Sequence, residues 1–264
     1  MSSKTIADRI KEYGIFTRSV ENPSPDDPSI LIIYGQSGRG KSLLLEQYNN
    51  WCRSNRVPVA HVDLRVGSRD PVDIIATIKD SFYPLPLPKS CKALRTTGWE
   101  PTSISHNTAI GLKNEYTIIN DPTLYLEEQK RYRISLAQAL SEDLRAQSQS
   151  HQKRFVILFD NYDEADPIAQ PWIYNHIIHL ATPSWVPGLT IVLTAKEKPK
   201  PSSEWAQYSK PLRLDRLPLE DWQNYAKAIG CTLSDEEIRK YYEKHGDNMI
   251  WMADAIETLA SDSD

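Results

Sequence analysis

Residues 29–42 read Ser-Ile-Leu-Ile-Ile-Tyr-Gly-Gln-Ser-Gly-Arg-Gly-Lys-Ser, and this stretch decides the fold. Its last eight residues match G-x-x-x-x-G-K-[ST], the pattern of a phosphate-binding loop (P-loop). The glycines let backbone N–H groups curve around a phosphate, Lys41 adds a positive charge, and the Ser42 hydroxyl can ligate Mg²⁺. A helix that begins at this loop directs the positive end of its dipole at the anion.

The residues around the loop have the context that the motif needs. Ile30 to Tyr34 form an apolar, β-branched run, which is typical of a buried parallel strand. After the loop, Leu44, Tyr48 and Cys52 recur at helical spacing on one face. We therefore expect the bound phosphates to lie against the loop and the position that follows it: Gly35, Gln36, Ser37, Gly38, Arg39, Gly40, Lys41, Ser42 and Leu43.

Composition narrows the classes of protein to consider. The chain has 264 residues, 40% of them hydrophobic, and a net charge of −4, so bulk charge does not favour nucleic acid or an anionic membrane as a partner. No apolar run is long enough to span a membrane, and Met1 to Lys4 lack the apolar core of a signal peptide. The three cysteines are far apart in the sequence, which indicates reduced thiols and a cytoplasmic location.

Hydrophobic periodicity predicts strands alternating with helices up to about residue 216, and hence a three-layer α/β fold around a parallel sheet. Besides the P-loop strand, we expect strands at 57–66, 155–159, 189–193 and 212–214, and helices at 74–82, 124–145, 173–180 and from 235 onward. The pattern breaks over 83–122, where prolines at 84, 86 and 88 are followed by a possible hairpin at 108–119. The expected organisation is a leader with a short helix at 5–13 (1–28), a P-loop domain with an insertion at about 84–122 (29–216), and a small helical lid (217–264).

A second strand supplies the acidic half of the site. The run from Phe155 to Phe159 ends in Asp160, at the strand end where ligands bind in open α/β sheets. Asp160 therefore fits the Walker-B role of holding Mg²⁺ together with Ser42. Asp163 and Glu164 lie just beyond it, where a carboxylate can orient or deprotonate an attacking water. Thr194, at the end of the next strand, is expected to reach the terminal phosphate.

Together these motifs resemble the STAND class of signalling NTPases, relatives of the AAA+ ATPases. Asp160-Asn161-Tyr162-Asp163-Glu164 is similar to the D-G-h-D-E form of Walker B in NACHT-type members. The stretch from Leu140 through Trp172 also resembles the novel STAND ATPases of bacterial conflict systems. The resemblance implies that Lys41 and Ser42 bind phosphate and Mg²⁺, that Asp160 holds the metal, and that Asp163 or Glu164 supports hydrolysis.

The chain departs from that family at two positions. The arginine expected after the Thr194 strand is Lys196, which keeps the charge but loses the two-pronged guanidinium. The lid motif G-x-P reads Gly246-Asp247-Asn248. The chain also ends before the winged helix and repeat array of full-length members, so we expect the effector and sensor to have been removed or to lie on other chains.

The sequence thus predicts an ATP- and Mg²⁺-binding switch that hydrolyses ATP slowly through Asp163, Glu164 and Lys41. Its expected partners are a protein effector or a second copy of itself assembled on ATP binding. Two other functions stay open: an AAA+-like ATPase that regulates a DNA transaction, and a nucleotide-binding oligomerisation scaffold with weak or no turnover. A nucleotide kinase fits less well, because the region after the second strand lacks a lid rich in arginines.

Overall fold

A computed structural model describes residues 9–21, 23–24, 26–65, 70–95, 122–151, 154–246 and 248–261. Within these ranges five strands form one parallel sheet: β1 (Ile30–Tyr34), β2 (Val59–Asp63), β3 (Phe155–Asp160), β4 (Leu189–Ala195) and β5 (Ser209–Arg213). The strand order is β2-β3-β4-β1-β5, so β1 lies between β4 and β5. The α/β prediction is confirmed, although β2 is shorter than the predicted 57–66.

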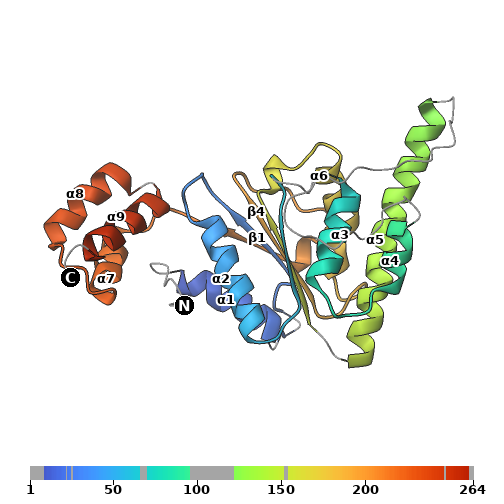
Figure 1. Ribbon diagram of the computed structural model, residues 1–264, viewed down its shortest axis with the longest axis horizontal. Coiled ribbons are helices and arrows are strands. Elements are labelled where there is room, and N and C mark those ends of the chain that lie inside the picture. The colour runs from blue at the N-terminus through green and yellow to red at the C-terminus, as the bar shows by residue number, and fades with distance from the viewer. Residues whose placement is uncertain are drawn as a thin grey trace.

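The sheet is covered on both faces, which gives the three expected layers (Figure 1). Side chains alternate along β1: Ile30 and Ile32 belong to one hydrophobic core, and Leu31 and Ile33 to the other. The first core contains residues of α3 (Pro71–Ser81), α4 (Pro88–Arg95) and α5 (Pro122–His151). The second contains residues of α1 (Ile10–Glu21) and α2 (Lys41–Ser54).

Helix α1 differs from the predicted leader. It begins at Ile10 and continues to Glu21 instead of ending at Tyr13; the predicted start at Thr5 lies outside the described residues. The continuation is explained by packing, because Phe16 is fully buried and its ring stacks on Tyr48 of α2 with centroids 3.9 Å apart. The tyrosine hydroxyl also donates to the Glu12 carbonyl at 3.0 Å, so α1 is attached to the helix that follows the P-loop.

Part of the region predicted as an irregular insertion is helical. Helix α4 starts at Pro88 and packs against α5, and its N-terminal groups are bound by the buried Asp143 of α5. This cap comes from a residue more than fifty positions away, which explains why local sequence did not reveal the helix. The predicted hairpin at 108–119 lies outside the described residues.

The predicted helix at 173–180 is present, but its winding is irregular. It consists of a short α-helical turn (α6, Ala169–Trp172), a π-helical turn (Ile173–Ile177) and a 3₁₀ turn (Ile178–Ala181). Trp172 donates from its indole nitrogen to the Arg133 carbonyl at 2.8 Å, which joins this segment to α5. Among the described helices, none is both long enough and apolar enough to cross a membrane.

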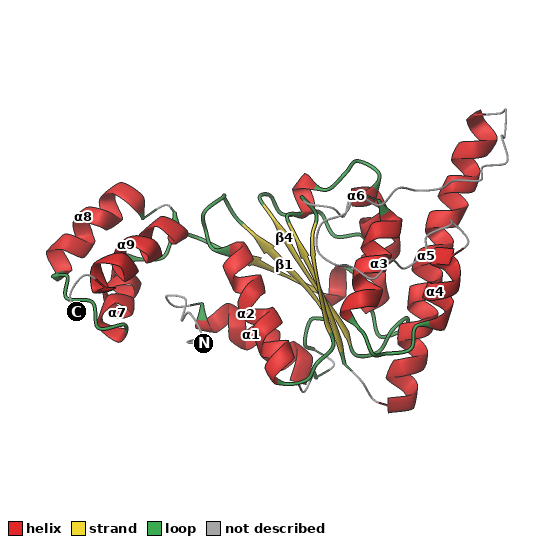
Figure 2. Cartoon of the chain, in the orientation of Figure 1, coloured by secondary structure: helices red, strands yellow, loops and turns green. Residues whose placement is uncertain are grey.

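The C-terminal helices form a group of their own on the far side of α1 and α2 from the sheet, drawn in orange and red in Figure 1 and also visible in Figure 2. They are α7 (Leu219–Ala228), α8 (Asp235–His245) and α9 (Met249–Ser261), and they have a core of their own that includes Trp222, Ile238 and Met252. A capping box begins α8, because Ser234 accepts from the Glu237 N–H while the Glu237 carboxylate accepts from the Ser234 N–H.

Candidate functional site: the P-loop edge of the sheet

The P-loop connects the carboxyl end of β1 to the start of α2. Gly38 and Gly40 have φ values of 80° and 81°, which glycine adopts readily and other residues rarely do. Gly35 is constrained by packing as well, since a Cβ there would lie 2.5 Å from the Leu214 carbonyl oxygen. Backbone conformation therefore favours glycine at positions 38 and 40, and packing requires it at position 35. The side chains of Gln36, Ser37 and Ser42 are exposed to solvent.

Lys41, the first residue of α2, extends back over the loop. Its Nζ donates to the carbonyl oxygens of Gly35 at 2.6 Å and Gln36 at 3.0 Å. Burial lowers the pKa of Lys41, an effect opposed by the negative charges of Asp163 and Asp160. The sequence-predicted lysine and the two acids, which come from distant parts of the chain, thus share one electrostatic environment.

Asp160 ends β3 and is buried, with 3% of its surface exposed. Its Oδ1 accepts the Thr194 hydroxyl of the neighbouring strand β4 and the Asn161 N–H at 3.0 Å. Thr194 is fully buried, so it lies against the Walker-B aspartate and not at the open phosphate position that the sequence suggested. The threonine orients Asp160, because its hydroxyl donates a hydrogen bond to one of the two carboxylate oxygens.

The two candidate catalytic acids lie on the 3₁₀ turn Tyr162–Glu164, and both contact Lys196. Asp163 accepts the backbone N–H of Lys196 at 3.0 Å, and its other oxygen lies 3.8 Å from the Lys196 Nζ. Glu164 accepts from the same Nζ at 2.7 Å. Lys196 therefore pairs with both acids, and the hydrogen bond to Glu164 is the main cause that raises the pKa of Lys196.

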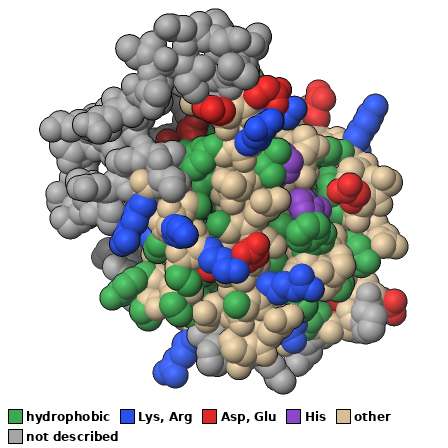
Figure 3. All heavy atoms as spheres, turned by 90° about the vertical axis from the view of Figure 1, so that its right-hand side faces the viewer, with side chains coloured by type: hydrophobic (Ala, Val, Ile, Leu, Met, Phe, Trp, Pro, Cys, Tyr) green, Lys and Arg blue, Asp and Glu red, His purple; other side chains and the backbone are tan. Residues whose placement is uncertain are grey.

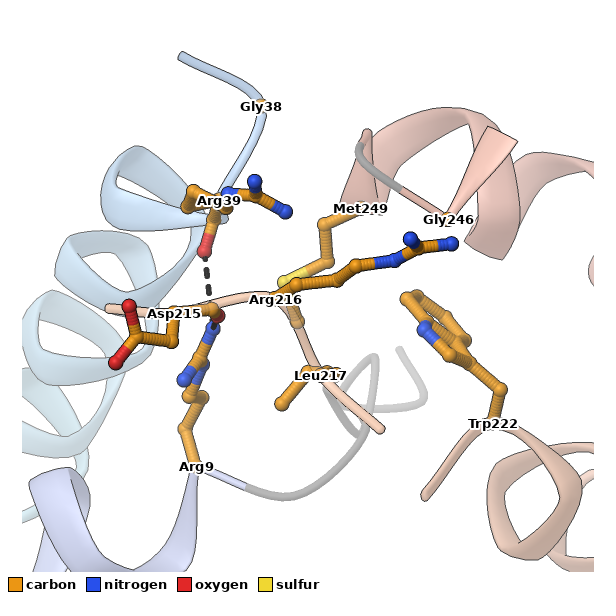
Figure 4. A pocket seen from close by; sticks show the side chains of 9 residues that line it. All are labelled: Arg9, Gly38, Arg39, Asp215, Arg216, Leu217, Trp222, Gly246 and Met249. Carbon is orange, nitrogen blue, oxygen red and sulfur yellow. Dashed lines mark hydrogen bonds between the residues drawn. The ribbon is translucent and has the colours of Figure 1, made fainter. Parts of the chain in front are cut away.

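A pocket lies between the P-loop, the start of α1 and the lid (Figure 4). Arg9 is 8% exposed and points into it, and its Nη2 donates to the Asp215 carbonyl at 2.8 Å and the Arg39 carbonyl at 3.3 Å. Burial lowers the pKa of Arg9. The side chain joins three segments that the sequence keeps far apart. The pocket is lined by Arg9, Gly38, Arg39, Asp215, Arg216, Leu217, Trp222, Gly246 and Met249.

The lid contacts the P-loop through the first residue of α9. The Met249 N–H donates to the Gly38 carbonyl at 2.7 Å, and a Cβ on Gly40 would lie 2.3 Å from the Met249 sulfur. Behind this contact Arg216 lies over the Tyr242 ring, 3.9 Å from its centroid, and donates to the Tyr242 carbonyl at 2.6 Å. Position 246 favours glycine, because a Cβ there would lie 2.4 Å from the Arg216 guanidinium.

No protein-family model matches this chain, and no curated protein matches it in sequence. Solved structures do match its fold. A Signal Transduction ATPase with Numerous Domains (STAND) protein with a tetratricopeptide repeat sensor, from Pyrococcus horikoshii, superimposes with a TM-score of 0.55 over 94% of this chain at 12% identity. Cdc6p from Pyrobaculum aerophilum, an AAA+ initiator, superimposes with a TM-score of 0.57 over 98% at 13% identity.

The fold is that of the STAND and AAA+ ATPases. At these identities the likeness establishes the fold alone. The chain spans 29% of the length of the STAND structure and 63% of that of Cdc6p. The resemblance noted in the sequence is confirmed at the level of fold.

Within this STAND and AAA+ fold, the residues at the P-loop edge suit a magnesium–nucleotide. The glycines at positive φ give the loop the curved backbone that can direct N–H groups at a phosphate, and Lys41 supplies the cation beside it. Ser42, at the start of α2, and Asp160, at the end of β3, would hold Mg²⁺, because hydroxyl and carboxylate oxygens are the ligands it prefers.

Four residues at or near the P-loop edge of the sheet were not predicted from the sequence: Asp63, Arg65, Arg9 and Met249. Asp63 ends β2 opposite Asp160 in the register, so the rule that ligands bind at carboxyl ends of parallel strands pointed to it. Its ion-pair partner Arg65 follows two residues later. Arg9 and Met249 gave no comparable signal, because each meets the loop only through tertiary packing.

Proposed function

We propose that this chain is a nucleotide-dependent switch that binds ATP with Mg²⁺ at the P-loop and hydrolyses it slowly. One observation carries the proposal: Lys41 extends over the P-loop and donates to the Gly35 and Gln36 carbonyls, at the edge of the sheet where β3 ends in Asp160 and is followed by the turn that carries Asp163 and Glu164. A surface turn rich in glycine would have no reason to gather these charges.

Binding depends on the loop and its lysine. Backbone N–H groups of the loop and the N-terminus of α2 attract the phosphates, and the Lys41 ammonium exchanges its two carbonyl partners for phosphate oxygens. Ser42 and Asp160 hold Mg²⁺, which when bound neutralises phosphate charge.

Hydrolysis requires a carboxylate that orients water, and Asp163 and Glu164 are the two candidates. Both are engaged by Lys196: Asp163 accepts its backbone N–H and lies 3.8 Å from its Nζ, and Glu164 accepts a hydrogen bond from the Nζ. This pairing supports slow turnover, because the acid must leave or share its lysine partner before it can act on water.

The switch itself lies in the contact between Met249 and the P-loop. The Gly38 carbonyl accepts a hydrogen bond from the N–H of Met249 in the lid. A phosphate that changes the conformation of the loop therefore also changes this contact with the lid. We further propose that the lid movement is read by a protein effector on another chain or by a second copy of this chain. In the sequence-based alternatives, DNA takes the place of that effector, or turnover is absent.

The proposal is tested by isothermal titration of Mg-ATP into the wild type and Lys41→Ala, with Lys240→Ala as a matched control. Lys240 is an exposed lysine whose ion pair lies within α8. We expect Lys41→Ala to weaken binding by about 100-fold or more, the worth of a strong charged contact, and Lys240→Ala to bind as the wild type does. Equal affinity in all three proteins would refute nucleotide binding at this loop.

Turnover and the alternatives are separated by phosphate release. We expect slow release from the wild type and loss of it in Asp163→Ala or Glu164→Ala with Mg-ATP affinity retained. Tight binding without release in the wild type would favour the scaffold. Binding to DNA that weakens steeply with salt would favour the DNA-directed ATPase. On the face that Figure 3 shows, basic and acidic side chains are interspersed, which gives this alternative no support from that side.

A further inference from the structure

Asn161, between the metal-binding aspartate and the two candidate catalytic acids, has a left-handed backbone. Its φ and ψ are 59° and 47°, a conformation that non-glycine residues avoid and that asparagine tolerates best. The NACHT-type motif that this segment resembles has glycine here. The chain therefore keeps the backbone conformation with a residue that also has a side chain able to form hydrogen bonds.

That side chain is held from the neighbouring strand. The Asn161 Nδ2 donates to Oδ1 of Asp63, at the end of β2, at 3.0 Å. Asp63 is itself fixed by Arg65, whose backbone N–H and Nε donate to Oδ1 at 3.1 and 3.2 Å and whose Nη2 donates to Oδ2 at 3.0 Å. Burial alone would raise the pKa of Asp63, but the hydrogen bonds from Arg65 and Asn161 outweigh it, so the pKa lies below its ordinary value and the carboxylate stays an acceptor.

The backbone of Asn161 is held from the opposite side. Its N–H donates to the Thr194 hydroxyl of β4 at 2.9 Å. Its carbonyl accepts the Glu164 N–H at 2.9 Å, which closes the 3₁₀ turn that carries both acids. Strands β2 and β4 flank β3, so the residue at the tip of β3 is fixed by both of its neighbours.

We propose that Asp63 is a positioning residue: by holding Asn161 in the left-handed conformation, it fixes the direction in which the turn presents Asp163 and Glu164. The proposal rests on the proposed hydrolysis, but it makes a structural claim as well. Asp63 acts on the two acids through Asn161. An exposed ion pair between Asp63 and Arg65 alone would contribute little to stability. The hydrogen bond from Asn161 to Asp63, in contrast, stabilises the left-handed backbone of Asn161 and so determines where Asp163 and Glu164 lie.

A double-mutant cycle tests this mechanism with Asp63→Ala, Asn161→Gly and the two combined. Glycine adopts the left-handed conformation without support, so it removes the need for Asp63. We expect Asp63→Ala to lower kcat about tenfold, as the loss of one charged hydrogen bond does, with the Kd for Mg-ATP unchanged. In the Asn161→Gly background the same change should alter kcat by less than about twofold.

Two further variants serve as controls for the cycle. Asp63→Asn keeps an oxygen acceptor at the same place and should restore most of the turnover. Asp80→Ala removes a carboxylate from another exposed ion pair, with Lys79 at the end of α3, and should behave as the wild type. A tenfold loss in Asp63→Ala that persists in the Asn161→Gly background, or that Asp80→Ala also shows, would overturn the proposal.

Hydrogen–deuterium exchange gives a readout that does not need ATP. The reporters are the amides of Glu164 and Ala165, which donate to Asn161 and Tyr162 within the turn. We expect them to exchange about tenfold faster in Asp63→Ala, and not in Asp63→Ala combined with Asn161→Gly relative to Asn161→Gly alone. If the wild type releases no phosphate, the proposed hydrolysis fails while this measurement still decides the role of Asp63; unchanged exchange in Asp63→Ala would refute it.

Discussion

At the scale of the residue, Gly40 is required for two separate reasons. Its φ of 81° favours glycine, and Met249 of the lid occupies the space where a Cβ would lie. The P-loop pattern accounts for the first reason and is readable in the sequence. The second arises only when α9 packs against the loop, and no local pattern reports it.

Gly40→Ala therefore should cost more than the backbone strain alone. Gly230 is a matched control, with a φ of 75° and no atom within 4 Å of an added Cβ. We expect Gly230→Ala to lower the free energy of unfolding by about 1 kcal/mol and Gly40→Ala by about 2–4 kcal/mol, the excess coming from overpacking against Met249. Thermal unfolding measures both. Met249→Ala should recover part of the excess in the Gly40→Ala background; no recovery would show that the sulfur is not the obstacle.

At the scale of the element, helices α8 and α4 begin in contrasting ways. Ser234 and Glu237 cap α8 from within its own first turn. Helix α4 depends on Asp143, whose Oδ2 accepts the Ser90 N–H at 2.7 Å and the Ser90 hydroxyl at 2.8 Å from within a buried site. A helix whose N-terminus is satisfied by another helix is stable only in the folded protein.

The two caps should respond differently to mutation. Asp143→Ala removes a buried acceptor from several donors and should lower the free energy of unfolding by about 3 kcal/mol. Ser234→Ala removes a local cap and should lower it by about 1 kcal/mol. Glu142→Ala, next to Asp143 but exposed and paired with the exposed Lys89, is the control and should have the smallest effect of the three. Denaturant unfolding ranks them, and an equal loss in Asp143→Ala and Glu142→Ala would contradict this account.

The same contrast explains how far the sequence leads. The strand ending in Asp160 and the helix after the P-loop were predictable, because the hydrophobic pattern of each lies within a short window of sequence. The extension of α1 to Glu21, helix α4 and the burial of Thr194 were not. Each depends on a residue far away in the chain: Tyr48 for α1, Asp143 for α4 and Asp160 for Thr194.

At the scale of the whole molecule, Arg9 connects the N-terminal helix to the P-loop and to the connection that leads to the lid. Its guanidinium donates to Arg39 in the P-loop and to Asp215 in the connection between β5 and the lid. Helix α1 is in turn fixed to α2 through Phe16 and Tyr48. The P-loop, the connection between β5 and the lid, and the start of α1 therefore meet at one buried side chain.

Arg9→Ala should loosen this junction. We expect the free energy of unfolding to fall by about 2 kcal/mol, the worth of hydrogen bonds from a buried charged donor, and Mg-ADP to dissociate several-fold faster. Lys11→Ala changes an exposed charge two residues further along α1 and should leave both quantities unchanged. Stopped-flow release of a fluorescent nucleotide measures the second quantity. Identical release from Arg9→Ala and Lys11→Ala would mean that α1 does not influence the nucleotide.

The contact between Met249 and the P-loop has a kinetic consequence. For a nucleotide bound as proposed, with its phosphates in the loop, we expect release to require that the hydrogen bond from Met249 to Gly38 breaks first. Its residence time is then set by how often the lid detaches, and only secondarily by how tightly the phosphates are held. Detachment of the lid would then limit the rate of nucleotide release, and residues of α8 and α9 that do not contact the nucleotide would determine that rate.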